Sequence, residues 1–351
     1  MITRRNSKII QIGGVAIGGN APIVVQSMTK TDTRNTKATI LQIKELEEAG
    51  CELVRVAVPD KQAAAAIRCI RNDISIPLIA DIHFDYRLAL DAIDSGVDGL
   101  RINPGNIGDP EKITTVVKAA KAKQIPIRIG VNAGSLPSDI DPDLPVAERM
   151  VSAALREINL LQELDFDLIK ISLKAFDVPT TIESYQRIAT MVPYPLHVGI
   201  TEAGVPPAGL IRSTAGIAPL LYQGIGDTIR VSLTGSPVEE VKAAYEILKS
   251  LNLRSRGPVL ISCPTCGRTE IDVVRITEEV NKRLSSYQKD IKVAVMGCAV
   301  NGPGEARDAD IGIAGGKGKA LLFKHGQKIR SISEDSIIPE LIKEIEYLSR
   351  E

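Results

Sequence analysis

Three cysteines near the end of the chain are spaced like ligands of one metal centre. Cys263-Pro-Thr-Cys266 puts two thiols on either side of a short turn, and a third thiol follows in Met296-Gly-Cys298. A tight turn brings the first two sulfurs to the same side, where one metal can bind both. Gly and Pro residues after Cys298 favour a loop that a cofactor can approach closely. The spacing therefore predicts a metal site.

The spacing leaves the kind of metal open. Tetrahedral zinc and a [4Fe–4S] cluster both take four ligands, but this segment has three cysteines. Nearby His325 lies in what reads as a hairpin, whereas Glu305 is placed to be the fourth ligand. An iron held by a carboxylate would be a labile corner where substrate can bind. Cys51 and Cys69 lie in or beside apolar segments, and we expect both to be buried and inert.

A second group of candidate residues is polar and lies within or at the ends of apolar, strand-like runs. A charge inside a strand is costly unless it is paired, and here cations outnumber acids. The surplus positive charge predicts an anionic ligand, and a guanidinium suits phosphate because it bonds two oxygens at once. The expected ligand is a small diphosphate. The cations are Arg55, Arg101, Arg128, Lys174 and Arg230, and the polar neighbours on the same runs are Asn103, Asn132 and Ser232.

Acid–base candidates lie at the same ends of these runs. Asp81 and His83 end the third run, and Glu202 follows the seventh, where a carboxylate would point into an open mouth. His197 lies within the seventh run, and it reads equally well as a functional group or as a hydrogen-bonded core histidine.

Eight apolar, β-branched runs alternate with segments of helical period over roughly 250 residues, which predicts an α/β fold with a (β/α)8 TIM barrel. An open doubly wound sheet is the alternative, but its glycine fingerprint is missing after the first strand. The expected strands are Pro22–Met28, Glu52–Val58, Pro77–His83, Gly99–Asn103, Pro126–Asn132, Leu168–Lys174, Pro195–Thr201 and Thr228–Leu233. Expected helices include Thr39–Ala49, Asp85–Ser95, Asp109–Lys123, Val146–Leu164, Ile182–Met191 and Val238–Leu251.

The chain divides at a linker, Ser250–Pro258. We expect a barrel domain over residues 1–250, with an N-terminal hairpin at 9–19, and a small α+β domain over 258–351. In the second domain the pattern predicts strands ending at Ser262 and at 291–296, 311–314 and 320–323, with helices at 271–284 and from about 336. Gly315-Gly-Lys-Gly318 lies between two strands and reads as a hairpin turn rather than a nucleotide site.

Composition narrows the function. The net charge is zero, aromatic residues make up 3% and Trp is absent, which argues against nucleic-acid binding. Five cysteines in 351 residues do not form a disulfide framework. The N-terminus lacks a signal core and no run is long enough to span a membrane, so we expect a cytoplasmic protein that does not act on membranes.

Several long motifs resemble the 4-hydroxy-3-methylbut-2-enyl diphosphate synthase family of isoprenoid biosynthesis, in its shorter bacterial two-domain form. The motifs are Cys263-Pro-Thr-Cys266-Gly-Arg-Thr, Met296-Gly-Cys298-Ala-Val-Asn-Gly-Pro-Gly-Glu305-Ala, Val25-Gln-Ser-Met-Thr29, Arg101-Ile-Asn-Pro-Gly-Asn106 and Arg128-Ile-Gly-Val-Asn132-Ala-Gly-Ser-Leu136. The resemblance implies that Cys263, Cys266, Cys298 and Glu305 hold a [4Fe–4S] cluster, that the barrel cations bind 2-C-methyl-D-erythritol 2,4-cyclodiphosphate and that Glu202 transfers a proton.

The family's reaction opens the cyclic diphosphate, removes water and adds two electrons. No flavin or nicotinamide fingerprint is present, so the resemblance implies an external donor, a ferredoxin or a flavodoxin. It also implies a homodimer in which each cluster domain covers the partner's barrel. Two alternatives remain from the residues alone: a non-redox, pterin- or phosphate-handling barrel enzyme with a small zinc domain, and an electron-transfer or binding module without chemistry of its own.

Overall fold

The computed structural model describes residues 2–83, 85–102, 110–285, 287–298, 304 and 306–350. The chain forms two compact units, Met1–Arg254 and Ser255–Glu351, which are treated separately below. None of the helices in the described ranges is long and apolar enough to cross a membrane.

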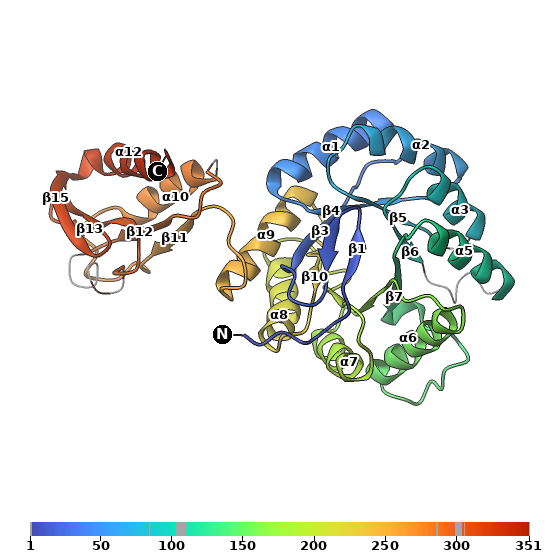
Figure 1. Cartoon of the computed structure of the whole chain (residues 1–351). Helices are drawn as coiled ribbons and strands as arrows, with labels where there is room; N and C mark the ends of the chain where they lie inside the picture. The colour runs from blue at the N-terminus through green and yellow to red at the C-terminus, as the bar shows by residue number, and fades with distance from the viewer. Residues whose placement is uncertain are drawn as a thin grey trace. The chain divides into compact units, whose positions relative to one another are not determined.

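The first unit is the predicted barrel, which Figure 1 shows as a ring of strands inside a ring of helices. All strand pairs in its eight-stranded sheet are parallel, in the order β8-β7-β6-β5-β4-β3-β10-β9. A single parallel bridge from Ile171 to Leu196 joins the two ends of this order. The strands are β3 (Val24–Met28), β4 (Leu53–Ala57), β5 (Leu78–Asp81), β6 (Gly99–Ile102), β7 (Ile127–Asn132), β8 (Ile169–Lys174), β9 (His197–Val198) and β10 (Thr228–Ile229).

In the described ranges, an α-helix lies between each strand and the next, and another follows β10. The helices are α1 (Thr36–Ala49), α2 (Lys61–Asn72), α3 (Tyr86–Asp94), α5 (Pro110–Ala122), α6 (Val146–Glu163), α7 (Val178–Met191), α8 (Ala208–Tyr222) and α9 (Pro237–Ser250). Some begin earlier than the apolar period indicates, because a polar cap fixes the first turn. Asp177 accepts a hydrogen bond from the Thr180 N–H at 2.8 Å, so α7 begins four residues before the expected Ile182.

The N-terminal hairpin, β1 (Ile10–Ile12) and β2 (Val15–Ile17), closes the bottom of the barrel. Its buried side chains pack against Val24, Leu53 and Ile79, which lie at or near the first residues of β3, β4 and β5. The amino ends of the strands are therefore covered. The carboxyl ends, where barrel enzymes carry their chemistry, are the other end of the ring.

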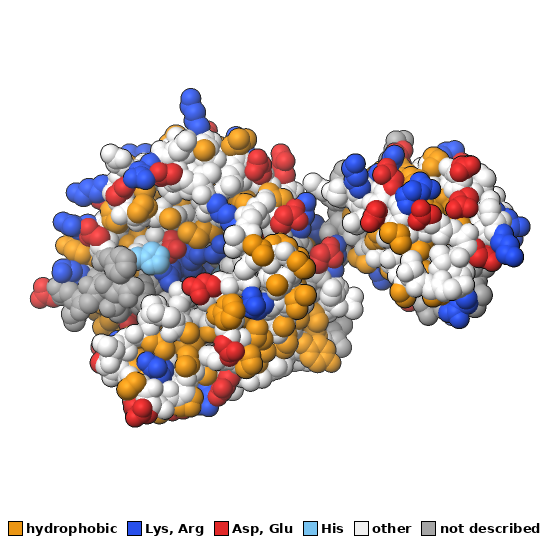
Figure 2. Space-filling model, turned by 180° about the vertical axis from the view of Figure 1, so that it is seen from behind, with side chains coloured by type: hydrophobic (Ala, Val, Ile, Leu, Met, Phe, Trp, Pro, Cys, Tyr) orange, Lys and Arg blue, Asp and Glu red, His pale blue; other side chains and the backbone are white. Residues whose placement is uncertain are grey.

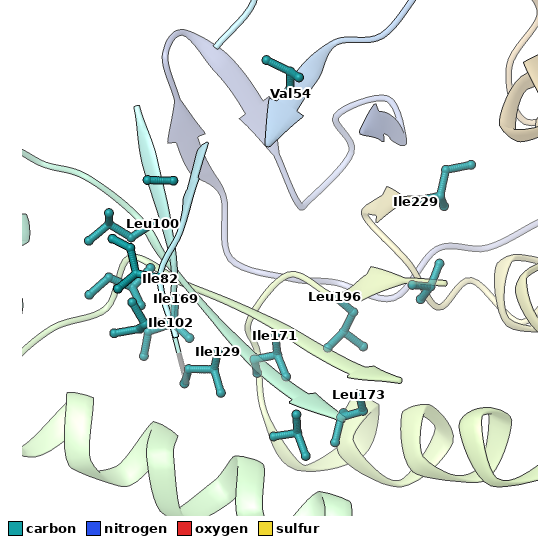
Figure 3. Packing of buried hydrophobic residues seen from close by; sticks show 14 of the residues in the cluster. Val54, Ile82, Leu100, Ile102, Ile129, Ile169, Ile171, Leu173, Leu196 and Ile229 are labelled. Carbon is teal, nitrogen blue, oxygen red and sulfur yellow. The ribbon is translucent and has the colours of Figure 1, made fainter. Parts of the chain in front are cut away.

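Side chains alternate along each strand between the helix layer and the barrel interior. Figure 3 shows Leu100, Ile102, Ile129 and Ile171 among the labelled aliphatic side chains of the layer between strands and helices. Because these positions face outward, the residues between them face inward. Arg101 and Arg128 are thereby directed into the barrel, and both are buried.

In its described residues, the second unit has a five-stranded sheet and the helices α10 (Val273–Leu284) and α12 (Ile337–Arg350). Its strands are β11 (Val259–Ser262), β12 (Lys292–Met296), β13 (Ile311–Gly316), β14 (Lys319–Lys324) and β15 (Gln327–Ser333). Lys317 and Gly318, with φ of 65° at Gly318, form the β13–β14 turn, which confirms the predicted hairpin. The sequence did not indicate β15, because that strand is mostly exposed and carries no apolar run.

One of the two isolated cysteines differs from expectation. Cys51 is buried, and burial raises the pKa of its thiol to about 12. Cys69 is exposed, so the prediction that it is buried was wrong. The buried face of α2 consists of Ala63, Ala64, Ile67 and Ile70, and Cys69 lies off that face.

Candidate functional site

Charged side chains fill the barrel interior toward the carboxyl ends of the strands. Figure 2 shows Lys and Arg side chains gathered on one face of the barrel unit beside a histidine. The contributing residues come from neighbouring strands or follow them directly: Arg55, Asp81, Arg101, Arg128, Lys174 and Arg230. The sequence-predicted cations thus lie in one interior, and the sheet register places Arg101 directly beside Arg128.

Asp81 is the counter-charge at the centre of this group. Its Oδ2 lies 3.5 Å from Nη1 of Arg55, and its Oδ1 lies 3.2 Å from Nη1 of Arg101 and 3.5 Å from Nε2 of half-exposed His83. Burial alone would raise the pKa of Asp81. The charge of Arg55, the hydrogen bond from His83 and the charges of Arg101 and Arg128 outweigh burial and hold that pKa well below its usual range. Asp81 is therefore an ionised carboxylate at neutral pH.

Several guanidinium donors in the interior have no acceptor among the residues that the structure describes. Arg128 donates from Nη1 to the Ser172 hydroxyl at 2.9 Å, but its Nε and Nη2 are buried without an acceptor among the described residues. The same holds for Nε of Arg101 and of Arg230. Buried donors are normally hydrogen-bonded, so unsatisfied ones need an explanation. A bound anion with several oxygens would supply the missing acceptors.

Lys174 ends β8 with its amine inside the barrel. Its Nζ lies 3.2 Å from Nε2 of His197, whose Nδ1 lies 2.7 Å from the Thr228 hydroxyl. Burial and the neighbouring cations lower the pKa of both Lys174 and His197 well below their usual values. His197 is therefore neutral at physiological pH. His197 is hydrogen-bonded to Lys174, a candidate anion-binding residue, and is not part of the aliphatic core.

Two interior residues were missed by the sequence analysis. Lys170 on β8 is fully buried, and its Nζ lies 3.5 Å from Oε1 of Gln26. Glu240 on α9 is also buried, and it pairs with Arg230 at 3.5 Å and with Lys30 at 3.0 Å. Lys170 precedes Lys174 by an even number of strand residues, so the alternation of β8 already placed both lysines on one face. The helical period of α9 places Glu240 at the edge of the buried face and Glu239 opposite it, but it does not show that Glu240 reaches cations of the interior.

Glu202 follows β9 in a strained loop. Its φ is 57°, in the left-handed region that a non-glycine residue adopts at a cost, and its side chain is exposed. Neighbouring loops hold the segment in place: the Thr201 N–H donates to the Ala175 carbonyl at 3.3 Å, and the Gly204 carbonyl accepts from the Thr234 N–H at 3.0 Å. The loop therefore presents a carboxylate beside the end of β8.

The remaining predicted barrel residues lie at the same end or outside the described ranges. Asn132 ends β7, and Ser232 follows β10; both are half-buried. Asn103 and the predicted fourth metal ligand, Glu305, lie outside the described residues.

In the second unit, the sheet brings two of the cysteines to the same edge. Cys263 directly follows β11 and Cys298 lies just beyond β12, and these strands are parallel neighbours with Ser262 beside Val295. The Gly297 N–H donates to Sγ of Cys263 at 3.1 Å. A hydrogen bond from the backbone of Arg268 lowers the pKa of the Cys266 thiol, which favours the thiolate.

These features fit a sulfur-ligated metal. Sulfurs that accept backbone N–H groups are typical of iron–sulfur sites. Within the described part of the chain, however, no three Cys, His, Asp or Glu side chains already converge as a metal-binding group.

Comparison with known proteins covers both units. Residues 7–245 match the GcpE TIM-barrel domain, and residues 259–347 match the GcpE protein C-terminal domain. A 4-hydroxy-3-methylbut-2-en-1-yl diphosphate synthase (flavodoxin) of Dehalococcoides mccartyi is 65% identical over 99% of this chain and 100% of its own length. The enzyme of the same name from Thermodesulfovibrio yellowstonii is 57% identical over 98% of this chain and 99% of its own.

Solved structures with low sequence identity share the barrel. Dihydropteroate synthase of Xanthomonas albilineans aligns with a TM-score of 0.51 at 14% identity, over 70% of this chain and 99% of that one. Type I 3-dehydroquinate dehydratase of Clostridium difficile aligns with a TM-score of 0.51 at 18% identity, over 70% and 97%. At such identities the likeness concerns the fold alone. The domain matches and the full-length relatives decide the classification, and the chain belongs to the GcpE family.

Proposed function

We propose that this chain is a flavodoxin-dependent 4-hydroxy-3-methylbut-2-en-1-yl diphosphate synthase, the name its full-length relatives carry. It would convert 2-C-methyl-D-erythritol 2,4-cyclodiphosphate to (E)-4-hydroxy-3-methylbut-2-enyl diphosphate. The balance is two electrons and two protons taken up and one water released. The observation that supports this most directly is the group of buried guanidinium donors that have no acceptor in the described part of the chain. Both domains match one family, and nothing supports the alternative of a non-redox barrel with a zinc domain.

In this proposal the barrel binds the diphosphate. The free donors of Arg101, Arg128 and Arg230 supply hydrogen bonds to its oxygens, and Arg55 and Lys174 add positive charge. Asn132 and Ser232 line the same end of the barrel. Asn103, which lies outside the described residues, is proposed as a further substrate-binding residue from the sequence. When the ring opens, negative charge grows on the departing diphosphate oxygen. Cations that are already in place stabilise that charge without reorganisation.

Proton transfer is assigned to Glu202 and His83. Glu202 is on a loop at the mouth, and His83 is half-exposed beside Asp81 and Arg101. Asp81 was an acid–base candidate from the sequence. Its pKa lies too far below neutrality for it to deliver a proton at physiological pH. We assign it instead to holding Arg55 and Arg101.

Cys263, Cys266 and Cys298, with Glu305 as the fourth ligand, are proposed to hold a [4Fe–4S] cluster. The hydrogen bond to Cys263 Sγ and the lowered pKa of Cys266 are consistent with sulfurs that act as thiolates. The bound group would supply the two electrons one at a time, as received from flavodoxin. We place the protein in the cytoplasm, whose reducing environment keeps free thiols reduced.

The diphosphate and the carbon–oxygen bond to be reduced belong to one small molecule, so barrel and cluster ligands must reach the same substrate. We propose that this is achieved in a homodimer with sites shared between chains. An apolar stripe on α8 supports a dimer: Ile211 and Tyr222 are 68% and 69% exposed, and Ala215 and Ala218 continue the same helix face.

The test is an anaerobic assay of the purified chain with the cyclic diphosphate and reduced flavodoxin. The product should be the linear diphosphate, and Arg128→Met should abolish turnover while the iron and sulfide content stays at the wild-type level. A pure protein that contains iron but gives no product with either reduced flavodoxin or a chemical reductant would refute the proposal.

A further inference from the structure

The barrel has a weak seam between β8 and β9. Its sheet order ends at these two strands, and the bridge from Ile171 to Leu196 is the backbone pairing found between them in the described residues. Every other neighbouring pair of strands in the barrel shares at least two residue pairs in register. Above that bridge, the described backbone contributes the hydrogen bond from the Thr201 N–H to the Ala175 carbonyl at 3.3 Å, so side chains hold the stretch of the seam in between.

Tyr185 of α7 provides one such connection. It is fully buried, its hydroxyl accepts the Leu173 N–H of β8 at 3.0 Å, and it donates to the His197 carbonyl of β9. One side chain thus links the two backbones where a ladder bond is missing. It also fixes the main chain that carries His197.

The second connection runs across the interior, from Lys174 through His197 to Thr228. In the ammonium form that binds an anion, Lys174 can only donate. Its Nζ then donates to Nε2 of His197, and the imidazole carries its proton on Nδ1 and donates it to the Thr228 hydroxyl. The titratable groups around the imidazole are Lys174 and Lys170 of β8, Arg128 of β7 and Arg55 of β4. All are basic and none is an acid, so a neutral imidazole is the form that this interior accepts.

Gly199 provides the space for the lysine amine. A Cβ atom at this position would lie 2.8 Å from Nζ of Lys174 and 2.4 Å from the Arg230 carbonyl. The residue has no positive φ, so its requirement for glycine is steric. His197 Nε2 and the space above Gly199 therefore both favour the same position of the Lys174 amine.

We infer that His197 is a positioning residue that fixes the Lys174 amine for the diphosphate. Thr228 holds the imidazole, and Gly199 leaves space for the amine. His197 takes one N–H of the amine, which leaves the others for the anion, and it does not itself contact the substrate. The inference rests on the proposed function, because Lys174 has been assigned there to diphosphate binding.

The test uses inorganic pyrophosphate as the probe and the full, iron-loaded chain, with affinity measured by calorimetry. His197→Asn keeps a group near Nδ1 for Thr228 but removes the acceptor for Lys174, whereas His197→Gln places an amide oxygen near Nε2. Loss of a charge-assisted hydrogen bond typically weakens binding about tenfold or more. We therefore expect about a tenfold loss for His197→Asn and a near wild-type affinity for His197→Gln.

A double-mutant cycle with Lys174→Met separates positioning from a general structural effect. If His197 acts through Lys174, adding His197→Asn to Lys174→Met should cost no further affinity. An equal loss in both backgrounds would overturn the inference. If Lys174→Met alone binds pyrophosphate like the wild type, the proposed diphosphate site fails, and this inference fails with it. Thr228→Val, which removes the hydrogen-bond partner of His197 Nδ1, provides the same cycle if His197→Asn does not fold.

Discussion

The Arg101 guanidinium lies where a side chain of Gly130 would be. A Cβ atom on Gly130 would come within 2.7 Å of Arg101 Nε and 3.0 Å of its Nη2, which donates to the Gly130 carbonyl at 3.4 Å. The two residues belong to neighbouring strands, β6 and β7, and both face the interior. The glycine therefore lets a buried cation lie flat against the strand, with Nη1 directed at Asp81.

Gly130→Ala is expected to displace Arg101 and weaken diphosphate binding. The loss of one charge-assisted contact costs about 1.5–3 kcal/mol, or roughly ten- to a hundredfold in pyrophosphate affinity. The matched control is Gly134→Ala, just beyond the same strand, where an added Cβ atom meets nothing within 4 Å. Calorimetry on both variants checks the prediction, and equal affinities would contradict it.

Asp81→Asn should destabilise the barrel because it leaves two buried guanidinium groups without their carboxylate. Breaking a buried pair costs about 3–5 kcal/mol. The folded-state pKa of Asp81 is depressed, so its stabilisation is complete above the unfolded-state pKa of about 3.9 and is lost as the pH falls below that value.

The pH dependence of turnover tests the counter-ion role of Asp81. Because Asp81 stays ionised between pH 5 and pH 9, the acidic limb of the turnover profile in that range should be unchanged in Asp81→Asn, even though the rate falls. A vanished limb would mean that Asp81 transfers the proton.

The barrel, its closing hairpin and the β13–β14 turn could all be predicted from the sequence, because each depends on local pattern: continuous apolar runs, glycines at turns and helical period. The positions of Arg101 and Arg128 followed from the alternation of side chains along strands. The first residues of the helices were less predictable. They depend on single capping contacts, such as Asp177 to Thr180, that periodicity does not report.

The contacts that organise the interior could not be predicted from the sequence. Glu240 lies more than 200 residues from Ser27, whose hydroxyl donates to it at 3.2 Å. The helical pattern of α9 indicates which face of the helix is buried, but it does not identify the residue that Glu240 contacts. The space beside Gly130 and Gly199 is likewise a property of neighbouring strands. Cys69 was misjudged because apolar neighbours in sequence do not tell which face of α2 is buried.

Each of the three C-terminal cysteines should be needed for iron binding. Cys263→Ser, Cys266→Ser and Cys298→Ser should each lose iron, acid-labile sulfide and activity after anaerobic purification. Glu305→Gln should weaken the cluster less, because three thiolates remain. Cys69→Ser is the control, since Cys69 is exposed on α2 in the barrel unit. Full iron content in any of the three serine variants would remove that cysteine from the ligand set.

Lys170 should make the free energy of unfolding of the barrel depend on pH below the ordinary pKa of a lysine, about 10.4. Burial and the charges of Arg128 and Arg55 lower its folded-state pKa, so the unfolded chain binds more protons between that value and about 10.4. The free energy of unfolding should therefore rise with pH across that window, by up to about 1.4 kcal/mol per pH unit for each such group.

Lys170→Met tests this dependence, with urea unfolding followed at several pH values. The variant should be more stable than wild type at pH 7 and show a shallower slope, with the remainder due to Lys174. Lys242→Met, an exposed lysine of α9, should keep the wild-type slope. Identical slopes in wild type and Lys170→Met would show that Lys170 retains its proton in the fold.

The proposed dimer predicts that activity returns when two inactive chains are mixed. Glu202→Ala leaves the cluster ligands intact, and Cys298→Ser leaves the barrel intact. If a barrel works with the partner's cluster, one of the two sites in a mixed dimer has both parts. Under conditions that exchange subunits, each mixed dimer should therefore have about half the activity of a wild-type dimer. If the mixture stays inactive although mixed dimers form, each site is built within one chain.

The stripe on α8 provides the structural control for this experiment. A charge at Ile211 would be buried in the interface, so Ile211→Glu should shift the chain toward monomer in light scattering and prevent complementation. Leu41 of α1 is comparably exposed at 63%, and Leu41→Glu should leave both the mass and the complementation unchanged. A dimer that survives Ile211→Glu would assign the interface to another surface, because an unpaired buried carboxylate costs several kcal/mol in an apolar contact.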